Sequence, residues 1–189
     1  MKRLHKQRRK NLNIPGHAHE LTFSCYRRFK FLAREQTCRW LAEAIDTARV
    51  KHQFSLWAYV FMPEHVHLIV CPQQPEYDIA SIRKSIKEPI ARKAIRHMEE
   101  ESPQGLEKIT RQRGHRTERL FWQSGGGYDR NIEQPATLER MIDYLHANPI
   151  RRGLVLMASD WPWSSASWYE GSNGSVLSVD PIPDTWAVD

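Results

Sequence analysis

Residues 54–71, FSLWAYVFMPEHVHLIVC, decide the fold of this chain. The runs Phe54–Phe61 and His65–Cys71 are rich in aromatic and β-branched residues, which favour β-strands. The three residues between the runs include Pro63, and proline is tolerated near a turn but not inside a central strand. We therefore predict a β-hairpin with Pro63 at or near its turn.

The segments on either side of this hairpin alternate between strand-like and helix-like patterns. Besides the hairpin over 54–71, we expect a strand over residues 19–26 and a glycine-interrupted strand over 121–128. We expect helices over residues 35–51, 78–100 and 137–147, and a loop over 101–118. Pro89 should kink or split the second helix, and Asn148-Pro149 should end the third. This order predicts one α+β domain, with a ferredoxin-like or RRM-like antiparallel sheet and helices on one face.

Composition sets limits on the class of protein. The 189 residues suffice for one domain with a buried core. No apolar run approaches the ~20 residues of a membrane span, and no apolar segment follows the basic start as in a secretory signal. We divide the chain into a basic arm (1–15), one folded domain (16–170) and a Gly-, Ser- and Pro-rich tail (171–189) that we expect to be disordered.

Basic residues are unevenly placed. The formal net charge is +6, and residues 1–10 alone carry six Lys and Arg and no acid. More basic residues cluster in the second predicted helix, among them Arg83, Lys84, Lys87 and Arg92. Such clustering suits a polyanion, most simply nucleic acid, although a solvated helix face is an equally good interpretation.

Two histidines in the hairpin are out of place by packing criteria. His65 and His67 are two residues apart in a strand otherwise rich in Leu, Ile and Val, so both imidazoles project from the same face. On a helix, Tyr144 and Asn148 are four residues apart and also share a face. The histidines predict a metal site. The Tyr-Asn pair, by itself, favours a core aromatic and a helix C-terminal residue before Pro149 over a nucleophile beside a metal-binding amide.

Together these motifs resemble the HUH single-strand nucleases, and within them the REP-associated tyrosine transposases. The resemblance rests on four ordered motifs, residues 62–67 (MPEHVH), 121–123 (FWQ), 143–149 (DYLHANP) with 153–155 (GLV), and 161–165 (WPWSS). It extends from about residue 19 to residue 168. The basic arm and the tail lie outside it.

The resemblance implies a particular chemistry. His65, His67 and Asn148 would hold a divalent metal, Mg²⁺ or Mn²⁺, against a DNA phosphate, and Tyr144 would attack phosphorus to give a 5′-phosphotyrosine link. The expected substrate is single-stranded or hairpin DNA, with Arg83, Lys84, Lys87, Arg92 and Arg130 as candidate DNA contacts. A phenol needs a base or a metal to become a good nucleophile, and no base can be named. The resemblance leaves open whether the protein is a monomer or a homodimer.

Two other functions are open at this point. One is a protein derived from such a transposase that binds DNA hairpins without cutting them, and the other is a metal hydrolase that uses Glu64 and a bound water. A second HxH pair, His17 and His19, could hold a metal, or His19 could line the active-site side of the sheet. Three tryptophans could stack bases or dock the C-terminal segment, namely Trp161, Trp163 and Trp168. Three cysteines, Cys25, Cys38 and Cys71, are too few and too irregularly spaced for a disulfide framework or a zinc knuckle, and they suggest reduced thiols in a cytoplasmic protein. With DNA as the substrate that the resemblance implies, we expect the protein to be nucleoid-associated.

Overall fold

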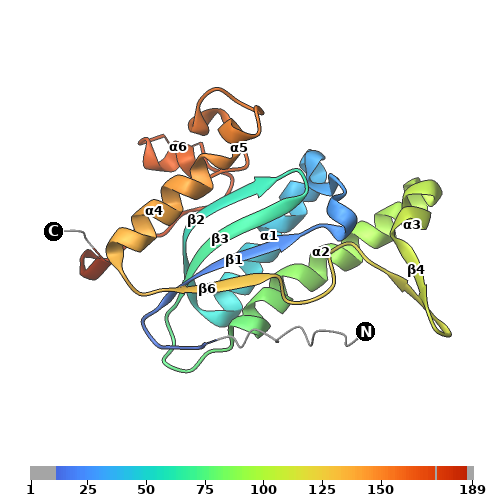
Figure 1. Ribbon diagram of the computed structural model, residues 1–189, viewed down its shortest axis with the longest axis horizontal. Helices are drawn as coiled ribbons and strands as arrows, with labels where there is room; N and C mark the ends of the chain where they lie inside the picture. Colours follow the sequence, from blue (N-terminus) through green and yellow to red (C-terminus); the bar gives the residue numbers. More distant parts are fainter. Residues whose placement is uncertain (1–11, 173, 187–189) are drawn as a thin grey trace, which may run out of the picture.

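The computed structural model describes residues 12–172 and 174–186, so the basic arm up to residue 11 lies outside the described part. A four-stranded antiparallel sheet in the order β2-β3-β1-β6 forms its centre (Figure 1). The strands are β1 (Ala18–Ser24), β2 (Phe54–Met62), β3 (His65–Pro72) and β6 (Tyr128–Ile132). Because β3 lies between the parallel strands β1 and β2, the topology is ferredoxin-like, and the predicted fold class is confirmed.

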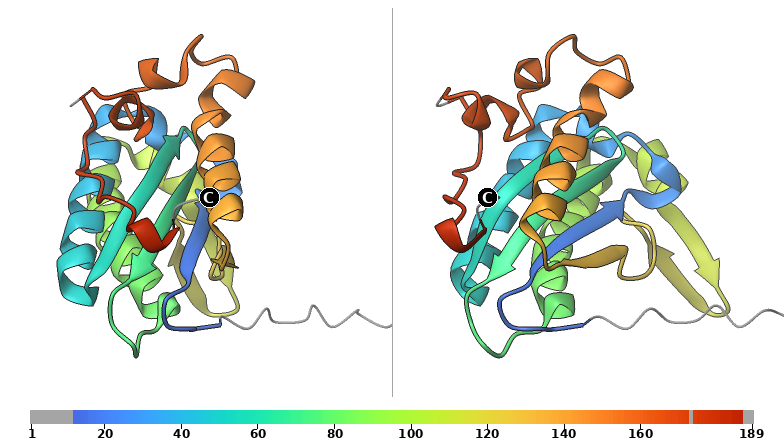
Figure 2. Two further views of the ribbon diagram at one scale, coloured as in Figure 1. Left: turned by 90° about the vertical axis from the view of Figure 1, so that its left-hand side faces the viewer. Right: turned by 60° about the vertical axis from the view of Figure 1, so that its left-hand side comes forward.

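Three long helices pack on both faces of this sheet. Helices α1 (Glu35–His52) and α2 (Ile79–Glu101) lie side by side on one face, and α4 (Pro135–His146) lies on the other (Figures 1 and 2). The prediction of helices on one face only is therefore wrong. Every residue of β3 is buried, and a strand that is apolar on both sides needs cover on both sides.

The predicted β2–β3 hairpin is confirmed, with Pro63 and Glu64 in its turn. In its register Val60 is opposite His67, and on the other side of β3 Thr22 of β1 is opposite His67. Alternation along β3 therefore sends Val66 and its even-numbered neighbours toward α1 and α2. His65 and the odd-numbered positions point to the face that α4 covers.

Two predictions about the middle of the chain are wrong. Helix α2 continues through Pro89 without a break; this proline is exposed, so its missing N–H lies on the solvent side. The expected loop over 101–118 instead contains α3 (Pro103–Ile109) and a hairpin of β4 (Thr110–Arg113) and β5 (Arg116–Arg119). Polar cross-strand pairs hold this hairpin rather than an apolar stripe, including Arg111 with Glu118.

The last strand of the sheet lies further along the chain than predicted, and it overlaps the predicted range 121–128 only at Tyr128. Only β6 joins the sheet, whereas Trp122 makes an isolated bridge with Cys25. A glycine turn separates the two. Gly127 adopts a positive φ of 82°, and a Cβ there would lie 2.3 Å from the carbonyl oxygen of Thr22, so only glycine fits.

The C-terminal region packs on the sheet. Its short elements are α5 (Asn148–Arg151), η3 (Ala158–Asp160), α6 (Ala166–Tyr169) and η4 (Asp184–Trp186). Two further short helices, η1 (Tyr26–Arg28) and η2 (Phe31–Ala33), lie between β1 and α1. The three tryptophans dock this region, and Trp161 Nε1 donates to the Phe61 carbonyl at 2.9 Å. We expected a disordered tail, but its described part buries Leu177 and Val179. Asp180 pairs with Arg49 and accepts from the Leu56 N–H, so the tail covers the free edge of β2.

Two further observations concern the whole described chain. None of its helices has the length and apolarity needed to span a bilayer. Its three cysteines are buried and unpaired, as expected from their number and spacing.

Candidate active site

Helix α4 places Tyr144 beside the histidine pair. Pro135 occupies the first turn of the helix, where its missing N–H costs nothing. Leu138, Ile142 and Leu145 form the buried stripe that docks α4 on the sheet. Tyr144 lies off this stripe, half exposed, with its ring centroid 6.4 Å from that of His67. The structure therefore brings the two predicted motifs together.

The two histidines lie side by side, as the strand spacing predicts. Their ring centroids are 5.0 Å apart, and both side chains are almost fully buried. Burial, together with the neighbouring His67, lowers the pKa of His65 to about 4. His65 is therefore neutral at pH 7, which is the state in which an imidazole binds a metal.

A carboxylate lies near the Nδ1 atom of each imidazole. Glu64 Oε1 lies 3.3 Å from His65 Nδ1, and Glu20 Oε1 lies 3.4 Å from His67 Nδ1. Thr22 Oγ1 also hydrogen bonds to His67 Nδ1, at 2.9 Å. Metal-binding histidines commonly use one ring nitrogen for such an oxygen and the other for the metal. Neither Nε2 atom has a protein partner within the described residues, so the donor set fits a divalent metal ion.

Asn148 lies at the end of α4, where α5 begins. Its amide nitrogen donates to the carbonyls of Tyr144 and Leu145, at 3.0 and 3.2 Å. These bonds fix the amide and leave Oδ1 without a protein partner in the described chain. No group of three or more His, Cys, Asp or Glu side chains within the described residues is arranged to hold a metal. A metal site at the two histidines with a third protein ligand would need a residue of another type, and Asn148 could supply one through its amide oxygen.

Glu64 connects the hairpin turn to the helix that follows Tyr144. Arg152, just after α5, donates to Glu64 Oε1 at 2.8 Å, and Arg28 Nη2 lies 3.5 Å from the same oxygen. Burial raises the pKa of the Glu64 carboxyl, but the Arg152 hydrogen bond and the positive charges of Arg152 and Arg28 outweigh it and hold this pKa below its ordinary value. The ionised Glu64 is thus a fixed point between strand and helix.

His146 is turned away from Tyr144, as its two-residue separation on the helix predicts. Its Nε2 lies 2.8 Å from Ser165 Oγ, and its ring packs edge-on against Tyr169. Burial lowers its pKa to about 4. His146 therefore belongs to the packing of the C-terminal region and not to the site.

A groove of about 460 Å³ opens beside Tyr144. Glu20 and Arg130 line it from the sheet, and Arg140 and Met141 line it from α4. The Arg151 guanidinium covers the Tyr144 ring, with 4.5 Å between the guanidinium carbon and the ring centroid. The nucleophile candidate is thus surrounded by arginines.

The basic residues expected on the second helix differ in exposure and do not share one exposed surface. Arg83 is only 6% exposed and lies under the glycine turn, where a Cβ on Gly126 would be 2.5 Å from Arg83 Nη2. Lys87 is half buried and donates to the Gly125 carbonyl at 3.1 Å. Lys84 and Arg92 are exposed. Arg83 therefore stays under the turn, and the exposed surface carries only part of the expected patch.

The second HxH pair lies apart from the site. His19 is completely buried on the α1–α2 face, where it bonds to Asp129 at 2.8 Å and to Tyr77 at 2.7 Å. His17 lies near Asn131 and Glu133 instead. The idea that His19 lines the active-site side of the sheet is wrong, because it shares the parity of Leu21 rather than that of Thr22.

Several site residues were missed by the sequence analysis. Glu20 and Thr22 reach the site only because β1 pairs with β3. Arg151 and Arg152 reach it through the turn after α4. The alternation of Glu20 and Thr22 with apolar neighbours was a usable signal, but the strand pairing was needed to connect it to His67.

Comparison with known proteins identifies the family of this chain and shows that its fold is shared. Residues 15–147, well over half of the chain, match the family model described as "Transposase IS200 like". A REP-associated tyrosine transposase of Escherichia coli (strain K12) is 26% identical over 125 residues, which cover 66% of this chain and 62% of that protein. The match thus spans less than two thirds of that relative's length.

One solved structure shares the fold over almost the whole chain. It is described as a REP-associated tyrosine transposase bound to a REP hairpin. The two structures superpose with a TM-score of 0.68 and 22% identity, over 97% of this chain and 92% of the other. At this identity the likeness shows the fold.

Proposed function

The chain belongs to the IS200-like transposase family, and from that premise we propose that it cuts and rejoins single-stranded DNA at hairpin-flanked sites. Tyr144 would be the nucleophile, and the activity would depend on a divalent metal. The observation that carries the proposal is the position of Tyr144 beside His67, with a groove lined by arginines leading to it. A half-exposed phenol next to two buried imidazoles is suited to reaction with an anionic diester.

The proposed reaction is a transesterification. The Tyr144 oxygen attacks phosphorus, and the bond between phosphorus and the 3′ oxygen breaks. The products are a 5′-phosphotyrosine link and a 3′-hydroxyl. The proton lost by the phenol balances the one gained by the 3′ oxygen. Because the bond energy is kept in the phosphotyrosine link, a 3′-hydroxyl can attack it and reverse the step, which joins the strands.

His65, His67 and the Asn148 Oδ1 atom would hold the metal, Mg²⁺ or Mn²⁺. When bound, a divalent ion neutralises charge that develops on the scissile phosphate. The protein's own part is to fix the ligands. Thr22 hydrogen bonds to His67 Nδ1, Glu20 and Glu64 lie beside the Nδ1 atoms of His67 and His65, and the Arg152–Glu64 ion pair ties the hairpin turn to the segment that follows Tyr144.

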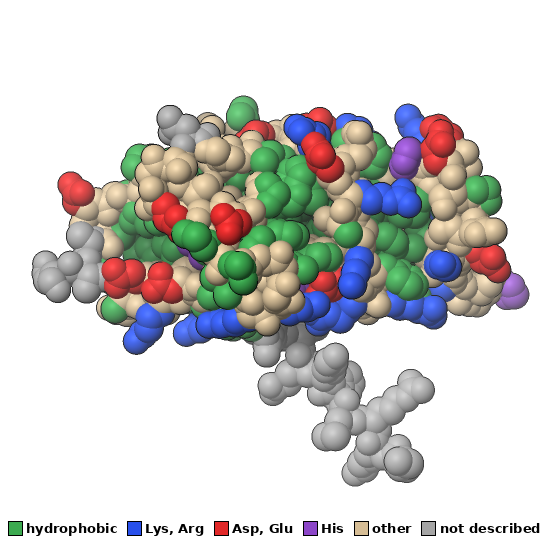
Figure 3. Space-filling model, turned by 90° about the horizontal axis from the view of Figure 1, so that it is seen from above, with side chains coloured by type: hydrophobic (Ala, Val, Ile, Leu, Met, Phe, Trp, Pro, Cys, Tyr) green, Lys and Arg blue, Asp and Glu red, His purple; other side chains and the backbone are tan. Residues whose placement is uncertain are grey.

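DNA hairpins are the substrate class that we propose, and the relative solved with a REP hairpin supports this choice. The charges near the site fit a polyanion, since Arg130 and Arg140 line the groove and Arg151 covers the Tyr144 ring, while Arg28 and Arg152 lie beside Glu64. Lys84 and Arg92 on α2 are candidates for further backbone contacts. Seen from the end that carries the β2–β3 turn, Lys and Arg side chains gather along one long side of the molecule (Figure 3).

The test is a covalent-adduct assay with labelled DNA hairpins that carry single-stranded flanks, in Mn²⁺ or Mg²⁺. A denaturation-resistant protein–DNA adduct should form with the natural protein and be absent with Tyr144→Phe. Tyr128→Phe is a matched control, because this other partly exposed tyrosine lies in the sheet edge. An adduct that persists in Tyr144→Phe would refute the assignment. Tight hairpin binding without any adduct would support a DNA-binding protein that does not cut.

A further inference from the structure

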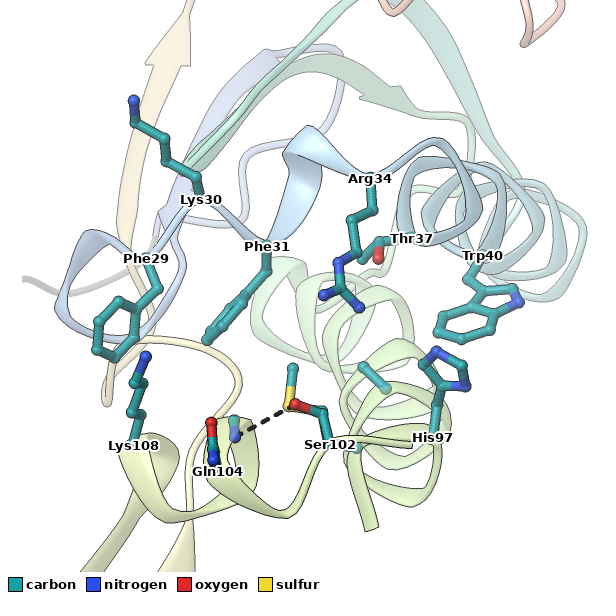
Figure 4. Close-up of a pocket in the computed structure, with 13 residues that line it drawn as sticks. Phe29, Lys30, Phe31, Arg34, Thr37, Trp40, His97, Ser102, Gln104 and Lys108 are labelled. Atoms are coloured by element: carbon teal, nitrogen blue, oxygen red, sulfur yellow. Dashed lines mark hydrogen bonds between the residues drawn. The ribbon is translucent and has the colours of Figure 1, made fainter. Parts of the chain in front are cut away.

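A second pocket lies next to the hairpin turn, outside the site described above. It has a volume of about 340 Å³, within the range of small-ligand sites. Its walls come from the segment before α1, from α1, from the end of α2 and from α3 (Figure 4). The rings of Phe29 and Phe31 form one side, and Trp40 and His97 form the other. Nothing in the proposed reaction uses these residues.

The charge of this pocket has one sign. Lys30, Arg34 and Lys108 line it, and no Asp or Glu does. None of these three cations has an ion pair or a side-chain hydrogen bond within residues 12–172 and 174–186. In Figure 4 the Arg34 guanidinium and the Lys108 side chain point toward the pocket, whereas Lys30 points away from it at the rim. Unpaired cations beside aromatic rings fit an anionic aromatic ligand.

The segment that lines one side of the pocket also packs against the hairpin turn of the proposed active site. The Leu32 N–H donates to the Pro63 carbonyl and the Cys25 N–H donates to the Glu64 carbonyl, each at 2.9 Å. Residues 25–32 thus pack along the turn that precedes His65. Arg28 lies between the two sites and faces Glu64. One short segment, residues 25–32, thus contacts the turn of the proposed active site and also contributes Phe29 and Phe31 to the pocket.

The backbone of this connecting segment is strained. Arg27 and Arg28 adopt positive φ values of 50° and 55°, which cost roughly 1 kcal/mol or more for each non-glycine residue. This conformation turns the chain so that Arg28 faces Glu64 and Phe29 faces the pocket. Because strained conformations persist only where the surrounding structure holds them, we infer that the orientation of Arg28 and Phe29 is important.

We propose that this pocket binds one unpaired nucleotide of the DNA strand next to the hairpin. The base would lie against Phe31 and Phe29, and Arg34 and Lys108 would contact its phosphates. Gln104 and Thr37 also line the pocket and carry donors and acceptors that can read a base edge. The proposal rests on the proposed function, because it assumes a DNA substrate with a single-stranded flank.

The test compares three DNAs with Tyr144→Phe protein, so that no covalent product forms. They are a blunt hairpin, the same hairpin with a 5′ extension, and the same hairpin with a 3′ extension. The double variant Arg34→Ala/Lys108→Ala should weaken binding of at least one extended hairpin by about tenfold and lower its salt slope by about 1.4. Binding of the blunt hairpin should change less than about twofold. Lys51→Ala, at the opposite end of α1, should change neither.

A second readout reports on stacking. A 2-aminopurine in the extension should lose fluorescence on binding, and Phe31→Leu, which keeps an apolar side chain of similar size, should restore it. If the double variant weakened binding of blunt and extended hairpins equally, or did not weaken binding at all, the proposal that the pocket binds a nucleotide would be overturned. An adduct in the natural protein together with that result would leave the proposed function standing, whereas no binding to any DNA would overturn both.

Discussion

The two faces of the central sheet are made by the same strands and serve different ends. On the α1–α2 face, even-numbered residues of β3 such as Leu68 are completely buried against two long helices. On the other face, α4 covers the part around Ile69 and leaves His65 and His67 beside Tyr144. A residue's role in β3 is thus set by its parity. One face is for stability, and the partly covered face is where chemistry can occur.

The sharpest test of this division is at His67. His67→Ala should lower the rate of adduct formation by at least about a hundredfold, since metal-ion charge stabilisation is worth several kcal/mol. Unfolding free energy and hairpin affinity should change much less. Single-turnover cleavage and denaturant unfolding check this. Parallel loss of folding and cleavage would mean that the histidines hold the sheet together.

Its neighbour Leu68 should show the opposite pattern. Leu68→Ala removes a completely buried side chain from the α1–α2 core and should cost about 2–5 kcal/mol of unfolding free energy. Cleavage per folded molecule should stay near that of the natural protein. Urea unfolding and active-site titration separate the two quantities. A larger effect on cleavage than on stability would contradict the assignment of roles by parity.

A smaller effect is expected where strand and helix are tied together. Arg152→Gln removes the hydrogen bond to buried Glu64 and should slow cleavage by about tenfold, because Tyr144 is then less well positioned. In a double-mutant cycle with Glu64→Gln, the two losses should not add. Additive losses would mean that Arg152 acts on DNA directly and not through Glu64.

The smallest effect concerns the rim of the α1–α2 face. Burial, with the charge of Arg83, lowers the pKa of Lys87 to about 8. An unfolded lysine keeps its proton to about pH 10.4. Between these pH values the unfolded chain holds more protons than the folded chain, so the unfolding free energy rises with pH. Below pH 8 the folded protein carries the full cost of keeping the partly buried Lys87 charged.

Lys87→Met should therefore raise the unfolding free energy at pH 7 by about 1–2 kcal/mol, a figure reduced from the full shift because Lys87 is partly exposed. The gain should shrink as the pH rises from 8 to 10. Unfolding curves at several pH values measure it. Lys84→Met, on the exposed side of the same helix, should show no such dependence. If the gain in unfolding free energy stayed constant with pH, the charge of Lys87 would not be its cause.

Sequence patterns predicted the parts of the fold that depend on local periodicity. The hairpin around Pro63 and the helix that carries Tyr144 follow from apolar spacing and turn residues alone. Two features did not follow, for different reasons. The β4–β5 hairpin is held by cross-strand polar pairs, which leave no apolar stripe, and the C-terminal segment is ordered by only a few buried residues such as Leu177.

The site was predictable to the same extent. Spacing within one element put His65 beside His67, because two-residue alternation is a property of the strand. Glu20 and Arg152 join the site through strand pairing and a helix turn, and neither is encoded within a single element. The position of α4 over the second face also depends on the whole core and not on its own sequence.

The register of β3 has a consequence for how the chain can change in length. Moving β3 by one residue relative to its neighbours would exchange its two faces, placing both imidazoles in the apolar core and Val66 and Leu68 beside Tyr144. A single insertion or deletion in the Pro63–Glu64 turn would thus remove the site and weaken the core in one step. The excursion formed by β4 and β5 is a separate two-stranded sheet, whose strands pair only with each other, and it projects from the end of the domain (Figure 1). Length variation should be tolerated at the tip of that excursion and excluded from the hairpin turn.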